Sequence, residues 1–463
     1  MGILYYLCNM KQVDSNMTTG AIAPHLIRFT IPLVLGNICQ LLYNATDATI
    51  VGQFLGKEAF AAVGAATPVI NIIIFLIIGI CLGASILMSE FYGARKWDAM
   101  RSELATTFLA GILFTISVIV LGIICAAPLM QVLQVPKQIL SDSVLYLRIQ
   151  FIGLVFTFIY NLYASALRSM GDSKIPLYFL FMSALLNIIM DILFIIVFQW
   201  GIAGTAWATV AAEALSALLC LVYVYFHIPV LKLKFKEFRI KRNLLHDTIS
   251  YSTITAMQQS CNNIGKMLIQ GAVNQLGVTS IAAFSAVSRI DDFMMIPQQN
   301  IGHAASTFLA QNRGANYYGR MIKGFLISVR LELVYSILLS VVIAFLVPSL
   351  IRIFIGNSEP EVVNIGSNYL YWMIFFYFIP SLTNIIQGYF RGMGKMKITL
   401  YSTIFQIGGR VIFVLILAPF WGVPGIAIAS LLGWCCMFLY ELPLFRKSWI
   451  RLKNKKSIEN SLT

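Results

Sequence analysis

The sequence predicts an all-α polytopic membrane protein built from twelve transmembrane helices. Of its 463 residues 59% are hydrophobic and only 11% are charged, whereas a soluble chain carries about 25% charged residues. Apolar runs long enough to cross a bilayer, which takes about 20 residues per helix, recur along the whole chain. The expected spans are roughly 27–51, 60–88, 105–127, 142–165, 177–198, 203–226, 247–272, 281–309, 325–348, 364–389, 399–419 and 424–446.

The basic residues of the connecting segments gather on one side of these spans. That side collects 25 Lys and Arg residues, and the other side has only Lys57, Lys137 and Arg352. The positive-inside rule therefore predicts cytoplasmic termini at both ends of a multi-pass protein of the cell (inner or plasma) membrane. The net charge of +14 follows from these loops, so we expect a lipid bilayer and no nucleic acid as partner. Met1 and Met17 both remain candidates for the start of translation.

The chain divides into two similar halves. Residues 54–65 resemble 275–286, and residues 168–178 resemble 391–401, at an offset of 221–223. Six spans per half give both halves the same orientation, which predicts two six-helix bundles related by pseudo-two-fold symmetry around a central cavity. The expected parts are a cytoplasmic N-terminal segment, an N-terminal lobe, a basic cytoplasmic linker, a C-terminal lobe and a basic cytoplasmic tail: 1–26, 27–230, 231–246, 247–446 and 447–463.

Carboxylates lie deep inside two spans of the first half. Asn187 and Asp191 are four residues apart near the middle of one span, and Gln40, Asn44 and Asp47 share a face of the first span. An acid at such a depth costs roughly 2.5–3.5 kcal/mol, and intramembrane acids usually mark transport paths.

Further polar faces occur on the other spans of this half, at Tyr146 and Asn161 and at Thr205, Thr209 and Glu213. Because lipid cannot satisfy these groups, we expect one polar pocket inside the N-terminal half. Contacts that only hold helices together remain an alternative for the amides. Burial disfavours the charged form of a carboxylate, so the two acids could take up H+ or, with neighbouring oxygens, Na+.

The second half carries different polar residues. Leu268 and Val414 stand where the repeat would place Asp47 and Asp191. Its candidate cavity residues are Gln259, Asn263, Lys266, Arg289, Asp292 and Arg410. Two interpretations stay open: that Lys266 or Arg289 pairs with Asp291 or Asp292 and holds helices together, or that these cations line the substrate path.

Enzyme chemistry has no support in the sequence. There is no GxxxxGK[ST] phosphate loop, the four histidines are scattered, and the eight cysteines nearly all lie in apolar runs without a CxxC motif. We expect neither an enzyme nor a cofactor, only H+ or Na+ as a coupling ion, and we expect a monomer.

The sequence resembles the multidrug and toxic compound extrusion (MATE) transporters over nearly its whole length. The most specific parts are Pro-Leu-Val-Leu-Gly-Asn-Ile-Cys-Gln-Leu-Leu-Tyr-Asn at 32–44, followed by Asp47, then Gly-Ala-Arg at 93–95 and Ala-Gln-Asn-Arg-Gly-Ala at 310–315. The resemblance implies V-shaped alternating access and export of small organic, mainly cationic, compounds driven by inward H+ or Na+.

In the branch with its cation site in the N-terminal lobe, the resemblance assigns ion coupling, including any Na+ binding, to Asp47, Asn187, Asp191 and Thr209. Tyr146 and Asn161 fit the supporting shell, to which we add Asn44 and Gln40, and Pro32 matches the proline linked to helix bending. The acids that another branch carries on spans 7 and 10 are missing here, which argues against a second cation site. A flippase or exporter of lipid-linked or anionic precursors remains the alternative, because Lys266, Arg289 and Arg410 would suit it.

Overall fold

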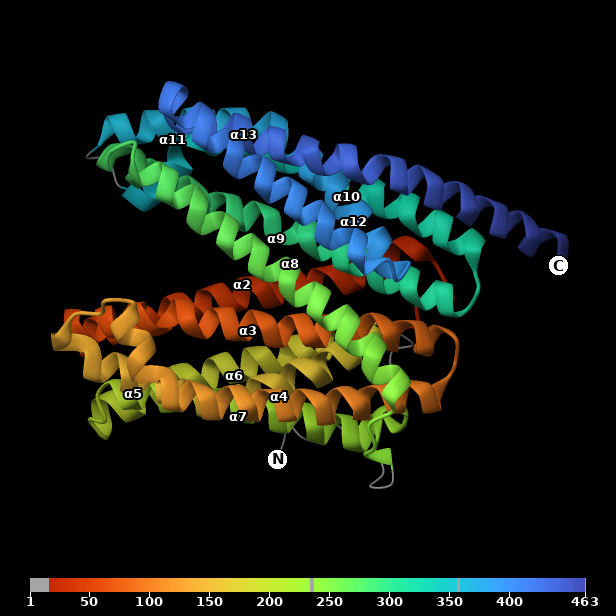
Figure 1. Ribbon diagram of the computed structural model, residues 1–463, viewed down its shortest axis with the longest axis horizontal. Coiled ribbons are helices and arrows are strands. Elements are labelled where there is room, and N and C mark those ends of the chain that lie inside the picture. The colour runs from red at the N-terminus through yellow and green to blue at the C-terminus, as the bar shows by residue number, and fades with distance from the viewer. Residues whose placement is uncertain (1–15, 234–236, 356–358, 463) are drawn as a thin grey trace. The chain divides into compact units, whose positions relative to one another are not determined.

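The structure is a computed structural model that describes residues 16–233, 237–355 and 359–462. The regular structure of these residues is entirely helical, which confirms the predicted fold class (Figure 1). The α-helices are α2 (Ile22–Phe54), α3 (Gly56–Gly93), α4 (Trp97–Val132), α5 (Lys137–Ser169), α6 (Lys174–Ile192), α7 (Ile202–His227), α8 (Arg242–Asn274), α9 (Val278–Gly314), α10 (Tyr318–Ile355), α11 (Pro360–Phe376), α12 (Phe378–Gly392) and α13 (Met396–Leu462). A π-helical turn, η1 (Leu193–Val197), extends α6, and a 3-10 turn, η2 (Pro229–Leu231), follows α7.

Three predicted spans differ from single straight helices. The predicted span 364–389 is broken into α11 and α12, which are bent by 51°. The last two predicted spans join in α13, which is interrupted only at Gly422 and continues through the predicted tail to Leu462. Among the described residues, eight helices are long and apolar enough to cross a membrane, or nine if α11 and α12 count as one. The polar residues of α8 and α9 keep these two helices below that threshold.

The chain forms two compact units. Unit 1 contains Ile31–Ala256, and unit 2 contains Met17–Thr30 together with Met257–Thr463. In unit 1, α5 packs against α3, α4 and α7, and in unit 2, α9 packs against α10, α11 and α12. This division differs from the predicted lobe boundaries at both ends, because α2 begins in unit 2 and α8 begins in unit 1.

The internal repeat is visible in the backbone of the described residues. Left-handed φ angles recur at matched positions: 84° and 89° at Gly56 and Gly277, 56° and 61° at Arg95 and Asn316, 93° and 70° at Gly171 and Gly394, and 59° at both Gly201 and Gly422. Each pair is separated by 221 or 223 positions, as the sequence predicts. Gly201 and Gly422 also share ψ, at −139° and −140°, in a region that is essentially restricted to glycine.

The segment before α2 is bound by residues of α9 and α10 in unit 2. Arg320 donates from Nε to Met17 O at 3.1 Å, from Nη2 to Thr19 O at 2.6 Å and from Nη1 to Gly20 O at 2.7 Å. Asn312 Nδ2 donates to Met17 O at 3.2 Å. The Met17 side chain is buried, so the segment before α2 is held both by charge-assisted hydrogen bonds and by packing.

The last turns of α13 contact the first turn of α10, which also contains Arg320. Gly319 N donates to Glu459 Oε2 at 3.1 Å, and Lys455 Nζ lies 5.1 Å from the centre of the Tyr318 ring.

Candidate functional site

The two deep acids of the first half come together inside unit 1. Asp47 lies on α2 and Asp191 on α6, and their carboxyl groups are close enough to interact directly. Asp191 is fully buried, with one carboxyl oxygen, Oδ1, that accepts no hydrogen bond from the described residues. Thr205 on α7 donates to Asp47 Oδ1 at 3.0 Å. Three helices therefore supply one acidic cluster, which we call the Asp47–Asp191 cluster.

The side-chain amide of Asn187 lies between Asp191 and the backbone of α7. When its nitrogen faces Asp191, it donates to Asp191 Oδ2 at 2.9 Å and its oxygen accepts the Thr209 N–H at 3.2 Å. In the opposite orientation two oxygens would face each other at that short distance, unless a proton or a cation lay between them. The orientation with the nitrogen towards Asp191 is therefore the one that satisfies both neighbours.

Tyr43 is a member of the site that the sequence analysis did not name, and Thr205, named there only as part of a polar face, contacts Asp47 directly. The Thr209 hydroxyl donates to the Thr205 carbonyl at 3.2 Å, so it stabilises α7, and it is Thr205 that contacts Asp47. Tyr43 is one helical turn before Asp47 and interacts with both Asp47 and Thr209. The four-residue spacing of Tyr43 and Asp47 is the sequence signal for Tyr43, because it places both side chains on one helix face. The sequence analysis followed the amides Gln40 and Asn44 instead.

A third acid, Glu213, belongs to the same polar region. Thr157 on α5 donates to Glu213 Oε2 at 2.7 Å, and Glu213 is also an electrostatic neighbour of Tyr43 and Tyr146. Gly153 makes room for it, because a Cβ atom there would lie 3.1 Å from Glu213 Oε2 and 2.9 Å from Val210 Cγ2.

The remaining predicted residues of this half fall into two groups. Tyr146 is buried beside Asp47 and Asp191, and Asn161 uses its amide to cap the Thr157 carbonyl at 2.8 Å. Gln40 and Asn44 are exposed, so the structure does not bring them to the acidic cluster. Pro32, inside α2, is buried near the point where that helix passes from unit 2 to unit 1.

In unit 2 the predicted cavity residues do not form a matching cluster. Lys266 Nζ and Asp292 Oδ1 form an ion pair at 2.7 Å with both side chains more than half exposed, and Arg289 is exposed without an ion pair to any described residue. Asn263 Nδ2 donates to the Gln259 carbonyl at 3.1 Å within α8. The first interpretation of Lys266, an ion pair between helices, agrees with this geometry.

Asp291, next to that ion pair in sequence, has different partners. Tyr369 donates to Asp291 Oδ2 at 2.7 Å, Tyr377 donates to Oδ1, and the Arg410 guanidinium is an electrostatic neighbour. Both tyrosines are fully buried. Each carboxylate oxygen thus has a donor and a cation compensates the charge, an arrangement that leaves little reason to bind another cation.

The two units therefore differ in what they can do chemically. Among the residues that the structure describes, the Asp47–Asp191 cluster holds two acids, one carboxyl oxygen without a donor and no basic group, so it can take up positive charge. The corresponding region of unit 2 already contains its compensating arginine.

Comparison with known proteins places the chain in a family. The MatE family model matches residues 32–193 and again 255–416. The probable multidrug resistance protein YpnP of Bacillus subtilis is 28% identical over 440 residues, covering 93% of this chain and 97% of that protein. The FAD transporter of Shewanella oneidensis is 24% identical over 390 residues, covering 81% and 84%.

Solved structures share the fold. A multidrug resistance MATE family transporter in its outward-facing conformation has a TM-score of 0.86 at 20% sequence identity, covering 97% of this chain and 100% of that one. The two family matches start 223 residues apart, at 32 and 255, which agrees with the internal repeat. From both halves of its sequence and from its fold, the chain belongs to the MatE family of membrane transporters, which are not enzymes.

Proposed function

We propose that this protein is a secondary active multidrug efflux transporter that exchanges small organic compounds for H+ or Na+ by alternating access. The Asp47–Asp191 cluster is the coupling site, with Asn187, Thr205 and Thr209 as its polar neighbours. The observation that carries the proposal is a pair of interacting carboxyl groups, one fully buried with an oxygen lacking a donor. The names of relatives such as YpnP support the substrate class.

The buried acids supply the coupling because they hold different charges in the two states. With Asp191 ionised, the Asn187 amide bridges it to the backbone of Thr209 on α7. Binding of a proton or Na+ at Asp191 lowers the negative charge beside this amide, so we expect the contact between α6 and α7 to weaken. A coupling ion can drive transport only if it binds two conformations with different affinity, and this contact gives it the means.

The proposal includes a topology and an assembly. The basic loops support a multi-pass protein of the cell membrane with cytoplasmic termini, working as a monomer. The resemblance to MATE transporters supports organic cations as substrates, with the acids of unit 1 as the deep negative charges.

The test is gradient-driven flux in proteoliposomes. A fluorescent organic cation is followed under a pH gradient in sodium-free buffer and, separately, under a Na+ gradient at equal pH, which identifies the ion. Asp191→Asn should abolish the response to the effective gradient, and Glu58→Gln, which neutralises an exposed acid in the first turn of α3, should retain it. Equal flux in both variants would reject the site, and flux without any gradient would reject coupling.

An exporter or flippase of anionic compounds is a second candidate. Arg410 occupies the position that matches Asn187, its buried Nε atom has no hydrogen-bond partner among the described residues, and a relative is an FAD transporter. Under this alternative, liposomes should move a flavin nucleotide or a lipid-linked anion rather than the organic cation. Arg410→Gln should then reduce the flux of the anion, and Lys323→Gln, on the first turns of α10, should not.

A further inference from the structure

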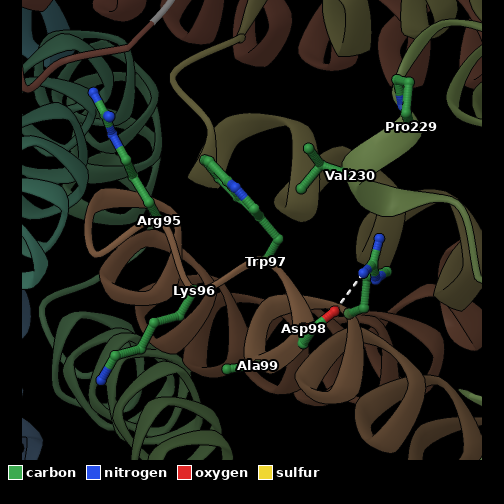
Figure 2. Close-up of a pocket in the computed structure, with 8 residues that line it drawn as sticks. Arg95, Lys96, Trp97, Asp98, Ala99, Pro229 and Val230 are labelled. Carbon is green, nitrogen blue, oxygen red and sulfur yellow. Dashed lines mark hydrogen bonds and ion pairs between the residues drawn. The ribbon is translucent and has the colours of Figure 1, made fainter.

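A pocket of about 630 Å³ lies in unit 1, away from the Asp47–Asp191 cluster. The turn between α3 and α4, the first turns of α4 and the residues Pro229 and Val230 of η2 line it (Figure 2). We propose that this pocket, here called the α3–α4 pocket, binds the headgroup of an anionic phospholipid from the cytoplasmic leaflet.

The charge of the α3–α4 pocket suits an anion. Arg95 and Lys96 are both exposed, and neither forms an ion pair with a residue that the structure describes. Arg95 has a left-handed backbone with φ of 56°, and its side chain extends the same way as the neighbouring Trp97, whereas Lys96 points to the other side of the turn (Figure 2). The start of α4, which has no side-chain cap hydrogen bond, adds the positive potential of a helix N-terminus.

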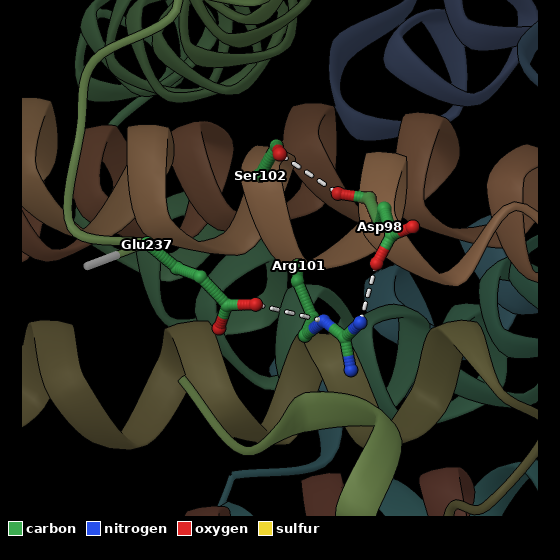
Figure 3. Close-up of polar contacts among 4 residues, drawn as sticks. All are labelled: Asp98, Arg101, Ser102 and Glu237. Carbon is green, nitrogen blue, oxygen red and sulfur yellow. Dashed lines mark hydrogen bonds and ion pairs between the residues drawn. The ribbon is translucent and has the colours of Figure 1, made fainter. Parts of the chain in front are cut away.

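The opposite wall is fixed by an ion-pair network (Figure 3). Arg101 pairs with Asp98 one turn earlier and, from Nε, with Glu237 Oε1 at 3.3 Å. Ser102 Oγ donates to the Asp98 carbonyl at 2.7 Å. Because two carboxylates already compensate Arg101, Arg95 is the cation left to face a ligand, and Lys96, on the other side of the turn, adds to the local positive potential (Figure 2). The contact with Arg101 holds Glu237 beside the first turns of α4.

A lipid fits this pocket better than a soluble anion. Trp97 is 37% exposed and lies with Pro229 and Val230 at the ends of the membrane helices, where tryptophan is enriched at bilayer surfaces. The linker that follows η2 contains six basic residues between Lys232 and Arg242. Such clusters next to membrane helices attract anionic lipids of the cytoplasmic leaflet, by about 1 kcal/mol or fivefold in affinity for each cation. A soluble phosphate would gain nothing from the apolar wall.

Quenching of Trp97 fluorescence tests the proposal. The protein is placed in nanodiscs containing phosphatidylglycerol or phosphatidylcholine brominated near the headgroup, and the Trp97 signal is the difference between the wild type and Trp97→Phe. We expect brominated phosphatidylglycerol to quench at a several-fold lower mole fraction than phosphatidylcholine. In Arg95→Gln/Lys96→Gln the apparent affinity for phosphatidylglycerol should fall about 25-fold, from a fivefold loss per cation.

Three controls decide the outcome. Arg451→Gln/Lys453→Gln removes two exposed cations of α13 and should retain the preference; an equal loss there would overturn the proposal in favour of general surface charge. Arg95→Lys/Lys96→Arg keeps the charge and should retain binding, so a loss in both pocket variants would contradict a charge-based site. Release of the quenching by millimolar inorganic phosphate would assign the pocket to a soluble anion instead, and equal quenching by both lipids would exclude headgroup recognition.

Discussion

The two units share a backbone and differ in their buried polar chemistry. Matched left-handed positions such as Gly201 and Gly422 have the same φ within a degree. Yet the positions of the acidic cluster, Asp47, Asn187, Asp191, Thr205 and Thr209, correspond to Leu268, Arg410, Val414, Ile426 and Ser430 in unit 2. The difference teaches that turns and helix ends maintain the architecture of both halves, whereas a few inward-facing side chains give only one half a pair of buried acids, to which we assign ion coupling in our proposal.

The largest expected effect separates the acids of the two units. Asp47→Asn should reduce gradient-driven flux about tenfold to a hundredfold, because the cluster loses one of its two carboxyl groups. Coupling free energies of about 1–3 kcal/mol correspond to changes in affinity of this order. Asp291→Asn should leave the dependence on the gradient unchanged, because its carboxylate is already satisfied by Tyr369, Tyr377 and Arg410.

The measurement is substrate flux in proteoliposomes against gradient size, with monodisperse elution as evidence of folding. A folded Asp291→Asn protein that no longer responds to the gradient would place coupling in both units and end the asymmetry.

A second prediction compares matched tyrosines, Tyr146 and Tyr369, which are 223 positions apart. Tyr369→Phe removes a hydrogen bond to a carboxylate and should lower the free energy of unfolding by about 1.5–3 kcal/mol. Tyr146→Phe should lower it by only about 0.5–1.5 kcal/mol, the range for a hydrogen bond between uncharged groups. Thermal unfolding in detergent measures both. The reverse order would mean that Asp291 is protonated and Tyr146 carries the charged contact.

These results separate what the sequence could predict from what it could not. Spacing placed Asp47 and Asp191 on inward faces, because lipid cannot solvate a polar stripe, and the offset of the repeat predicted the matched turns. It could not rank Thr205 above Thr209, since both lie on one face of α7 and only the contact with Asp47 distinguishes them. The same stripe argument brought in Gln40 and Asn44, which are exposed, because spacing alone does not specify which neighbour covers a face.

The long-range pairings were equally beyond the sequence. The partners of Asp291 come from α11 and from the break before α12, 78 and 86 residues away, and no local pattern links such positions. The sequence also did not show that α2 begins in unit 2 and α8 in unit 1. The basic linker indicates a connection between the halves, but it does not indicate with which half the start of each helix packs.

A third prediction tests the shared backbone. Gly201→Ala and Gly422→Ala should each destabilise the protein by about 1–3 kcal/mol, because both positions require a conformation that side chains avoid. Neither new Cβ would meet another atom within 4 Å, so the cost comes from the backbone alone and should be similar in the two units. The melting temperatures of the two variants test whether the two losses of stability are equal. Clearly different values would show that the matched turns share a conformation but do not contribute equally to stability.

The smallest effect concerns the ion pair of Lys266 and Asp292, whose matched positions in unit 1 are the uncharged Ala45 and Asn71. Both side chains are largely exposed, so a double-mutant cycle with Lys266→Met and Asp292→Asn should give a coupling free energy of only about 0.2–1 kcal/mol. If Lys266→Met instead changes which substrates are transported at normal stability, the cation serves the substrate path rather than helix packing.

The first turn of α10 is contacted both by the segment before α2 and by the last turns of α13, which has a practical consequence. Arg320 grips the residues that precede the first membrane helix, while Tyr318 and Gly319 contact the last turns of α13. A probe or a protease cut close to Met17 or to Glu459 therefore disturbs the same first turn of α10. For labelling studies, probes belong in the loops of unit 1, where they leave these contacts of α10 intact.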